Sequence, residues 1–175
     1  FCIIACRAQQ PIAKIASEKV KVNNTIYKLI KPDNKVTQII NINNKLTKVK
    51  QIAPNMPSDL KIPGYRKFDK NILLKICAEV IPLTTLQNLP RGYNDYLFMT
   101  IKVNTEGEPL EIEFLLKNNS LITPEEIQKI EYKIFESSFK VSFTKGIERY
   151  FKGVNYFNID VMIQYNEMLK AKVGN

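Results

Sequence analysis

Two neighbouring stretches of the chain alternate apolar and polar residues with a period of two. The first runs from Leu97 to Val103 and the second from Leu110 to Leu116, with the turn Asn104-Thr105-Glu106-Gly107 between them. Side chains on a strand point alternately to opposite faces, and Asn and Gly accept the backbone angles of tight turns. The pattern predicts a β-hairpin with one apolar and one charged face, which needs a single covering layer.

The apolar spacing then changes to that of a helix. The segment Thr123-Pro124-Glu125-Glu126 predicts a helix start, with a capping hydroxyl, a proline at the first helical position and a glutamate three residues after the cap. A second helix is predicted after Asp69, ending at Pro82. A short extended piece at 139–143 and a long strand at 156–165 complete the pattern. The order predicts an α+β fold of two layers.

These segments resemble the C-terminal domain of the TonB family of envelope proteins. The resemblance rests on the hairpin YLFMTIKVNTEGEPLEIEFLL, the helix TPEEIQKIEYKIFESS, the extended FKVSF and the closing strand YFNIDVMIQY. It implies an antiparallel sheet of three to four strands packed with two helices. A Pro-rich spacer is missing, and Asn118-Asn119-Ser120 replaces the family's usual Ser-Ser-Gly, so energy coupling to a transporter is not implied. The whole chain also resembles small uncharacterised exported proteins of Bacteroides-type bacteria.

The N-terminal part predicts a separate small sheet. Strands are expected at 25–30, 36–42 and 46–52, with turns between them, giving a β-meander over 25–52. Residues 9–24 are expected to be a tether or a loosely held strand. Residues 53–65 contain three prolines and are expected to be a linker to the main domain at 66–170. A small sheet is marginal alone, so the meander is expected to pack on that domain or to form a homodimer.

The first eight residues are apolar and predict the remnant of a signal peptide. Two processing routes fit: lipidation of Cys6 after a lipobox-like Ile3-Ile4-Ala5, or cleavage after Ala8. A truncated structural segment is the third interpretation. Either processing route implies an exported protein, located in the periplasm or attached to the outer membrane as a lipoprotein.

The net charge of +9 is unevenly distributed. Residues 1–75 hold 15 Lys and Arg against 4 Asp and Glu, whereas residues 76–175 hold 11 against 13. Arginine, which suits bidentate recognition of phosphates and bases, is rare in the chain. We therefore expect no nucleic-acid partner, and a weak attraction to an anionic envelope surface instead.

The sequence offers few catalytic groups. It contains no histidine, which excludes the usual Ser-His-Asp and Cys-His catalysis and His-ligated metal sites. We predict no catalytic residue, metal or cofactor, and assign Cys77 to the core. Glu111 and Glu113 share a strand face about 7 Å apart, a spacing found in paired-carboxylate hydrolases. The competing interpretation is a solvated strand face with Lys102 nearby, and Asp160 is also expected to be exposed.

Aromatic residues gather before and within the last strand. We predict a partner-binding surface there, made of Tyr150, Phe151, Tyr156, Asn158 and Asp160. The alternative is a loop folded over the sheet edge. The first hypothesis is a non-enzymatic envelope protein that binds an envelope protein or peptide through this loop or a sheet edge. The second is a glycan-binding or hydrolytic protein that acts on envelope polymers through surface carboxylates.

Overall fold

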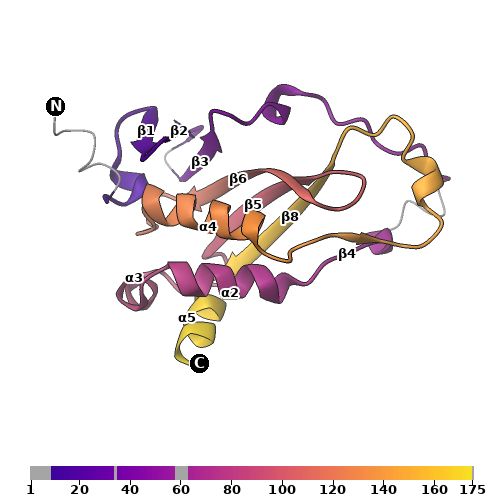
Figure 1. Cartoon of the computed structure of the whole chain (residues 1–175). Helices are drawn as coiled ribbons and strands as arrows, with labels where there is room; N and C mark the ends of the chain where they lie inside the picture. Colours follow the sequence, from indigo (N-terminus) through magenta and orange to yellow (C-terminus); the bar gives the residue numbers. More distant parts are fainter. Residues whose placement is uncertain (1–8, 34, 58–62, 175) are drawn as a thin grey trace.

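The computed structural model describes residues 9–33, 35–57 and 63–174, and it confirms the α+β class (Figure 1). The main sheet contains β1 (Lys19–Val22), β2 (Thr25–Ile30), β3 (Val36–Asn41), β5 (Tyr96–Val103), β6 (Pro109–Lys117) and β8 (Phe157–Gln164). The helices are α2 (Lys70–Val80), α3 (Leu83–Asn88), α4 (Pro124–Glu136) and α5 (Tyr165–Val173). The short strands β4 (Arg66–Lys67) and β7 (Ser142–Phe143) pair with each other, and single 3-10 turns form η1 (Ile12–Lys14), η2 (Leu46–Lys48), η4 (Pro63–Tyr65) and η5 (Glu148–Tyr150).

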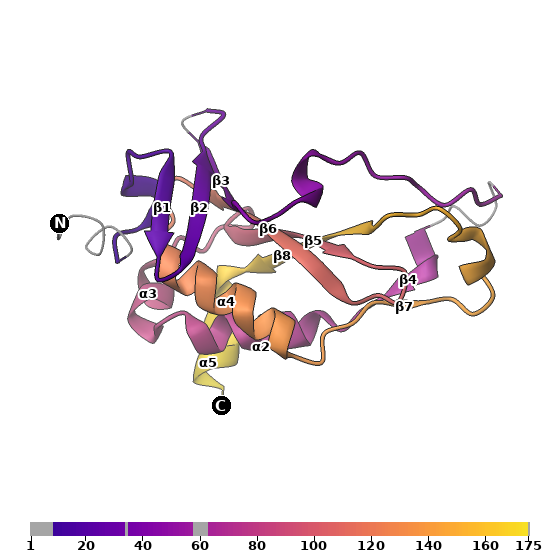
Figure 2. The same cartoon turned by 45° about the horizontal axis from the view of Figure 1, so that its top comes forward.

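The six strands of the main sheet follow the order β1-β2-β3-β6-β5-β8, and every neighbouring pair is antiparallel. Strands β1 and β8 are therefore its two edges. Figures 1 and 2 show α2, α4 and α5 on one side of the sheet, while residues 42–57 cross the other side. We call residues 42–57 the strap. The helices thus cover one face, and the strap covers part of the other.

The predicted hairpin forms as β5 and β6. Leu97, Met99, Ile101 and Val103 are fully buried against the helices, as their alternation predicts. At the turn, the Asn104 side chain accepts hydrogen bonds from the main chain of Glu106 at 3.0 Å and of Glu108 at 2.8 Å. Gly107 has a φ of +84°, and a Cβ there would lie 1.8 Å from the carbonyl oxygen of Val141. Only glycine fits this position.

The predicted helix starts are confirmed. Thr123 and Glu126 form a reciprocal capping box at α4, with a main-chain N–H donated to each side chain. The Asp69 carboxylate accepts the Asn71 N–H at 2.9 Å and caps α2. Each cap satisfies donors that a helix cannot pair internally, which fixes where these helices begin.

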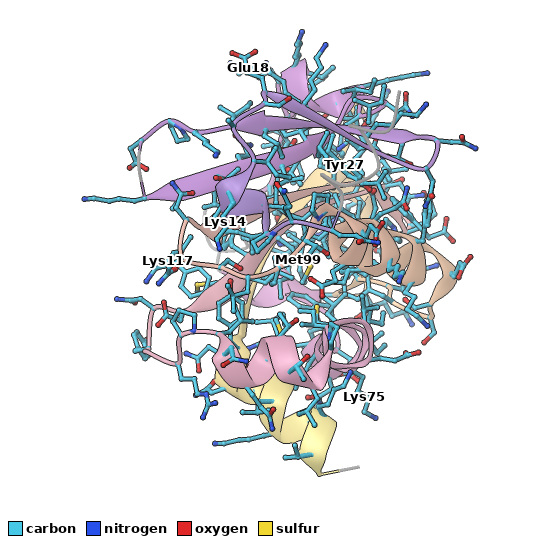
Figure 3. The ribbon with its side chains drawn as sticks, turned by 90° about the vertical axis from the view of Figure 1, so that its left-hand side faces the viewer. Lys14, Glu18, Tyr27, Lys75, Met99 and Lys117 are labelled. Atoms are coloured by element: carbon cyan, nitrogen blue, oxygen red, sulfur yellow. The ribbon has the colours of Figure 1, made fainter. Side chains whose placement is uncertain are left out.

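Polar side chains fill the contact between α4 and strands β2 and β3. The Tyr27 hydroxyl donates to the Glu131 carboxylate, which also accepts from the Asn41 amide at 3.3 Å. Only 3% of Glu131 is exposed, and burial raises the pKa of its carboxyl. Figure 3 shows Tyr27 in the interior between the strands and the helices. The network ties the N-terminal strands to α4.

The N-terminal strands are not a separate sheet. Strand β3 pairs with β6, with Val36 opposite Lys117 and Ile40 opposite Glu113, so β1–β3 extend the hairpin sheet to six strands rather than three or four. The meander therefore packs on the rest of the chain by strand pairing, the first of the two expectations. Residues 19–22 of the expected tether form β1.

The third predicted strand, at 46–52, is wrong. The Glu111 carboxylate accepts the main-chain N–H groups of Lys45 and Leu46, and residues 46–48 turn into η2. A main chain that bonds to a side chain in this way cannot also form a strand ladder. The prediction also missed α3 and α5: Tyr165, expected to end the last strand, begins α5. None of the helices described combines the length and apolar character needed to cross a bilayer.

Candidate functional site

The candidate site lies along the free edge of β8. This strand pairs with β5 on one side only. In an antiparallel ladder, the N–H and C=O of alternate residues point to the same side. The Asn158 C=O accepts from the Arg66 guanidinium at 2.8 Å, and the Gln164 N–H donates to Glu167 at 3.3 Å, so both point away from β5. The main-chain groups of Asp160 and Met162, which have the same parity, also point away from the sheet.

These two residues form the open part of the edge. Arg66 covers the edge at Asn158 and Glu167 closes it at Gln164. Among the described residues, no hydrogen bond reaches the outward N–H and C=O groups of Asp160 and Met162. The edge therefore presents two donors and two acceptors to whatever lies beside it.

A groove with a volume of about 410 Å³ runs beside this open edge. Its lining includes Tyr93 from the segment before β5, Tyr96 at the start of β5, Met162 and Asp160 from β8, and Phe68 before α2. Tyr93 is 86% exposed and Met162 52% exposed, which is unusual for side chains of this size. An ion pair of 3.0 Å between Lys70 and Glu167 closes one end. The groove offers apolar surface next to free main-chain groups.

The apolar lining continues onto the face of the sheet that is opposite the helices. In the strand register, Phe98 of β5 lies opposite Leu115 of β6 on one side and Met162 of β8 on the other. Directly opposed residues share a face, so these three form an apolar row that ends at the open edge. No helix covers this face among the residues described. A strand added to β8 would extend the row by one position.

The structure separates the five predicted partner-binding residues. Phe151 and Tyr156 are buried: the Phe151 ring packs against Phe143 and Phe157 at centroid distances of 4.9 and 4.8 Å, and the Tyr156 hydroxyl donates to the Val49 carbonyl of the strap. Tyr150 is half-buried beside the Arg149 guanidinium, 4.8 Å from its ring centroid. The aromatic cluster is thus mainly a loop folded onto the sheet, the alternative interpretation.

Asn158 and Asp160 have different surroundings. Asn158 is half-buried and donates through its amide to Gln51 of the strap at 3.2 Å. Asp160 is exposed, as expected, and accepts a hydrogen bond from Thr100 at 2.8 Å. Of the five predicted residues, Asp160 alone combines exposure with a place on the open edge.

The carboxylate pair Glu111 and Glu113 is enclosed under the strap. The buried Lys102 ammonium pairs with both, at 3.6 Å from Glu111 and more closely with Glu113. Glu113 also accepts from Thr47 at 2.9 Å and Gln38 at 3.0 Å. The expectation of a solvated strand face is therefore wrong, although Lys102 is the neighbour that was expected. The oxygens of the pair are thus bonded to Lys102, to Gln38 and to the strap, and the pair fixes the strap.

The cysteines and acidic groups offer no further chemistry in the described part of the chain. Cys77 is fully buried, as expected, and burial raises the pKa of its thiol to about 12, so the reactive thiolate is suppressed. No group of three or more Cys, Asp or Glu side chains within 9–57 and 63–174 is placed to hold a metal ion. Cys6, the proposed lipid-attachment residue, lies outside the described residues.

Sequence reasoning identified β8 as a possible edge but missed Tyr93. Tyr93 lies in Arg91-Gly92-Tyr93-Asn94, a turn-like segment with no periodic pattern. An aromatic ring between turn residues was the available signal, since such a ring has no strand or helix face on which to be buried.

No protein-family model matches the chain, and no curated protein matches it. The fold is similar to the crystal structure of a DUF5043 family protein from Bacteroides uniformis, with a TM-score of 0.62. The similarity covers 90% of this chain and 87% of that one at 14% sequence identity, so it concerns the fold. It supports the resemblance to Bacteroides-type proteins. The resemblance to the TonB domain is not confirmed, because this neighbour is described as a DUF5043 family protein.

Proposed function

We propose that this protein is a non-catalytic interaction module that binds an extended segment of another polypeptide along the open edge of β8. The observation that carries the proposal is the set of outward N–H and C=O groups of Asp160 and Met162 beside an apolar groove. A peptide strand placed there forms hydrogen bonds to β8, and its alternate side chains enter the groove. Each main-chain hydrogen bond contributes about 1 kcal/mol, so the expected affinity is modest.

The enclosed carboxylates favour binding over hydrolysis. A hydrolase of the paired-carboxylate type needs two acids facing a shared space for the substrate and a water. Glu111 and Glu113 instead bond Lys102 and the strap, and Asp160 lies on the exposed edge. The groove that Asp160 lines includes neither Glu111 nor Glu113 in its lining, which favours the peptide proposal over the hydrolytic alternative.

We further propose an envelope protein or peptide as the partner, with this protein exported to the periplasm or held at the outer membrane through a lipid on Cys6. The support is the composition of residues 1–8, which resembles a processed export signal. Metabolic labelling with a fatty-acid analogue, comparing the natural chain with Cys6→Ala, tests the anchor. Labelling of both forms, or of neither, would remove the lipoprotein proposal.

The peptide proposal is tested with ten-residue peptides selected from a random display library on the folded protein. Met162→Pro removes one outward donor, while the bonds of β8 to β5 come from residues of the other parity, so the sheet is retained. We expect binding of the selected peptides to weaken at least tenfold in Met162→Pro. Met162→Ala, which keeps the N–H, is expected to lose much less. Affinities are measured by isothermal titration calorimetry.

Lys21→Pro is the matched control, because Lys21 lies on β1, the opposite edge of the same sheet. It is expected to bind the peptides as the natural chain does. Peptides that bind Met162→Pro unchanged would refute the edge as the binding site. A homodimer formed by two β8 edges is a distinct outcome, visible as a concentration-dependent mass that Met162→Pro abolishes.

A glycan is the second candidate ligand of the same groove, because the exposed Tyr93 ring and the Asp160 carboxylate both line it. Aromatic surface with a few polar groups is typical of ligand sites. A glycan would depend on Tyr93 and Asp160, and it should lose no more affinity in Met162→Pro than in Met162→Ala, because it needs no main-chain donor of β8. The two ligand classes therefore respond to different variants.

A further inference from the structure

The charge of the described chain is divided between two regions. Residues 9–57 hold nine lysines against two acidic residues and no arginine, an excess of seven positive charges. Residues 63–174 hold fifteen basic and fourteen acidic residues. A general preference for lysine would raise the count in both regions, so it does not explain the difference. The excess belongs to β1–β3, the loops around them and the strap.

Six of these lysines lie on the side of the molecule that faces away from α2 and α5. Lys19 and Lys28 are directly opposed in the β1–β2 register and, with Lys21, lie on the strand face opposite the buried Val20 and Tyr27. Figures 1 and 3 show these strands and the strap together on this side, with α2 and α5 on the other. We define the basic face as Lys19, Lys21, Lys28, Lys45, Lys48 and Lys50.

The lysines of the basic face are free to meet a partner. All six are exposed, and among the described residues none forms an ion pair with a carboxylate. Lys31, by contrast, donates to the carbonyls of Ala13 and Ile15 and is therefore excluded from the set. Figure 3 labels Glu18 near these strands, and Glu18 and Asp33 together leave an excess of seven positive charges over residues 9–57.

The strap is held to the sheet mainly by its main chain. The N–H of Leu46 donates to Glu111, and the N–H of Ile52 donates to Asn155 at 2.8 Å. The Val49 carbonyl accepts from Tyr156, and the Lys50 carbonyl accepts from Asn155 at 3.0 Å. The side chains of Lys45, Lys48, Val49, Lys50 and Ile52 are thereby left exposed.

Exposed aliphatic side chains lie before, between and after the lysines of the strap. Ile42, Val49 and Ile52 are 48%, 43% and 54% exposed. Such exposure is unfavourable in water, and in the strap it occurs beside three lysines with no acidic residue. Lysines interleaved with aliphatic side chains are the composition of a segment that lies in the headgroup region of an anionic membrane.

We propose that the basic face binds the surface of an anionic lipid bilayer, with its lysines among the headgroups and Val49 and Ile52 at the acyl boundary. Lysines act as point charges, and a diffuse layer of lipid charge requires nothing more specific. A nucleic-acid surface would favour arginine and aromatic side chains and would gain nothing from exposed aliphatic ones. The groove beside β8 and the basic face share no residue, so the two proposals can be tested separately.

The test is sedimentation of the protein with vesicles of phosphatidylcholine alone or with 30% phosphatidylglycerol. We expect binding to the anionic vesicles only, lost when sodium chloride is raised from 0.1 to 0.5 M because salt screens exposed charges. Each lysine near an anionic surface strengthens binding about fivefold. The triple variant Lys45→Gln, Lys48→Gln, Lys50→Gln should therefore bind about a hundredfold more weakly.

The matched control changes three exposed lysines of the helical side, Lys75→Gln, Lys129→Gln and Lys170→Gln, with the same loss of net charge. It should bind within about threefold of the natural chain, since those lysines face away from the bilayer. Val49→Ser with Ile52→Ser is expected to weaken vesicle binding severalfold. Leu83→Ser with Val173→Ser, on the helical side, is expected to leave it unchanged. Circular dichroism checks that all four variants fold.

Three results would overturn the proposal. One is equal binding to neutral and anionic vesicles. Another is an equal loss in the strap and helical-side lysine triples, which would show an effect of net charge alone. The third is a combined result in which Val49→Ser with Ile52→Ser leaves vesicle binding unchanged and duplex DNA binds as tightly through the same lysines. The basic face would then be a general site for polyanions.

Discussion

Glu131 is a buried carboxylate that forms no ion pair among the described residues. It accepts hydrogen bonds from Tyr27 and Asn41, yet burial outweighs these bonds and raises the pKa of its carboxyl. The native state therefore holds the proton of this group at a higher pH than the unfolded chain does. The contribution of Glu131 to the free energy of unfolding is fully present below the ordinary pKa of a glutamate. It falls as pH rises from this ordinary pKa to the raised pKa of the native state.

Glu131→Gln removes this titration. We expect the free energy of unfolding of the natural chain to fall, relative to that of Glu131→Gln, as pH rises from 4 to 8. Urea denaturation at each pH measures it. Glu126, whose pKa is also raised by burial, leaves a residual slope in both proteins. Glu136→Gln changes an exposed carboxyl and should run parallel to the natural chain. A constant difference between the natural chain and Glu131→Gln would contradict the argument.

Gly107 combines a positive φ with a close approach to another segment. Gly107→Ala forces the alanine Cβ against the Val141 carbonyl in addition to straining the backbone, and we expect a loss of about 3 kcal/mol or more. Gly146 has a similar φ of +92° with no atom within 4 Å of a Cβ. Gly146→Ala should therefore cost only about 1 kcal/mol. Equal losses in the free energy of unfolding for Gly107→Ala and Gly146→Ala, measured by urea denaturation, would show that Val141 shifts to accommodate the added Cβ.

At the scale of elements, the sequence predicts those parts whose cause is local. The β5–β6 hairpin follows from the alternation of apolar residues and from its turn residues, and the start of α4 follows from a capping box. In each case the residues that determine the element lie within it or directly beside it. The strap could not be predicted in the same way. Its residues 46–52 alternate like a strand, but its main chain forms hydrogen bonds with the side chains of Glu111 and Tyr156, which are distant in sequence.

The same distinction separates the parts of the candidate site. The edge position of β8 was anticipated from its length and its place at the end of the pattern, and Asp160 from its polar side of the strand. The burial of Phe151 and Tyr156 depends on Phe143 and on the strap, which the local sequence does not place. Lys102 looked like a solvent-facing strand residue because the strap that covers it comes from elsewhere in the fold. Its acidic partners lie on the other strand of the predicted hairpin.

The whole molecule is expected to unfold as one unit, although its sequence suggested a separate N-terminal module. Strand β3 is paired along five positions with β6, and Tyr27 is bonded to Glu131 of α4, so removal of β1–β3 would expose a central strand and a buried carboxylate together. We expect the slowest amides of β2 and β3 to exchange with the same free energy of opening as those of β5 and β6. Native-state hydrogen exchange with mass spectrometry measures both sets. Glu131→Gln removes the charge and leaves the strand pairing, so the two sets should remain equal in that variant. Earlier opening of β2 and β3 in the natural chain would show that the β3–β6 seam separates two independently stable parts.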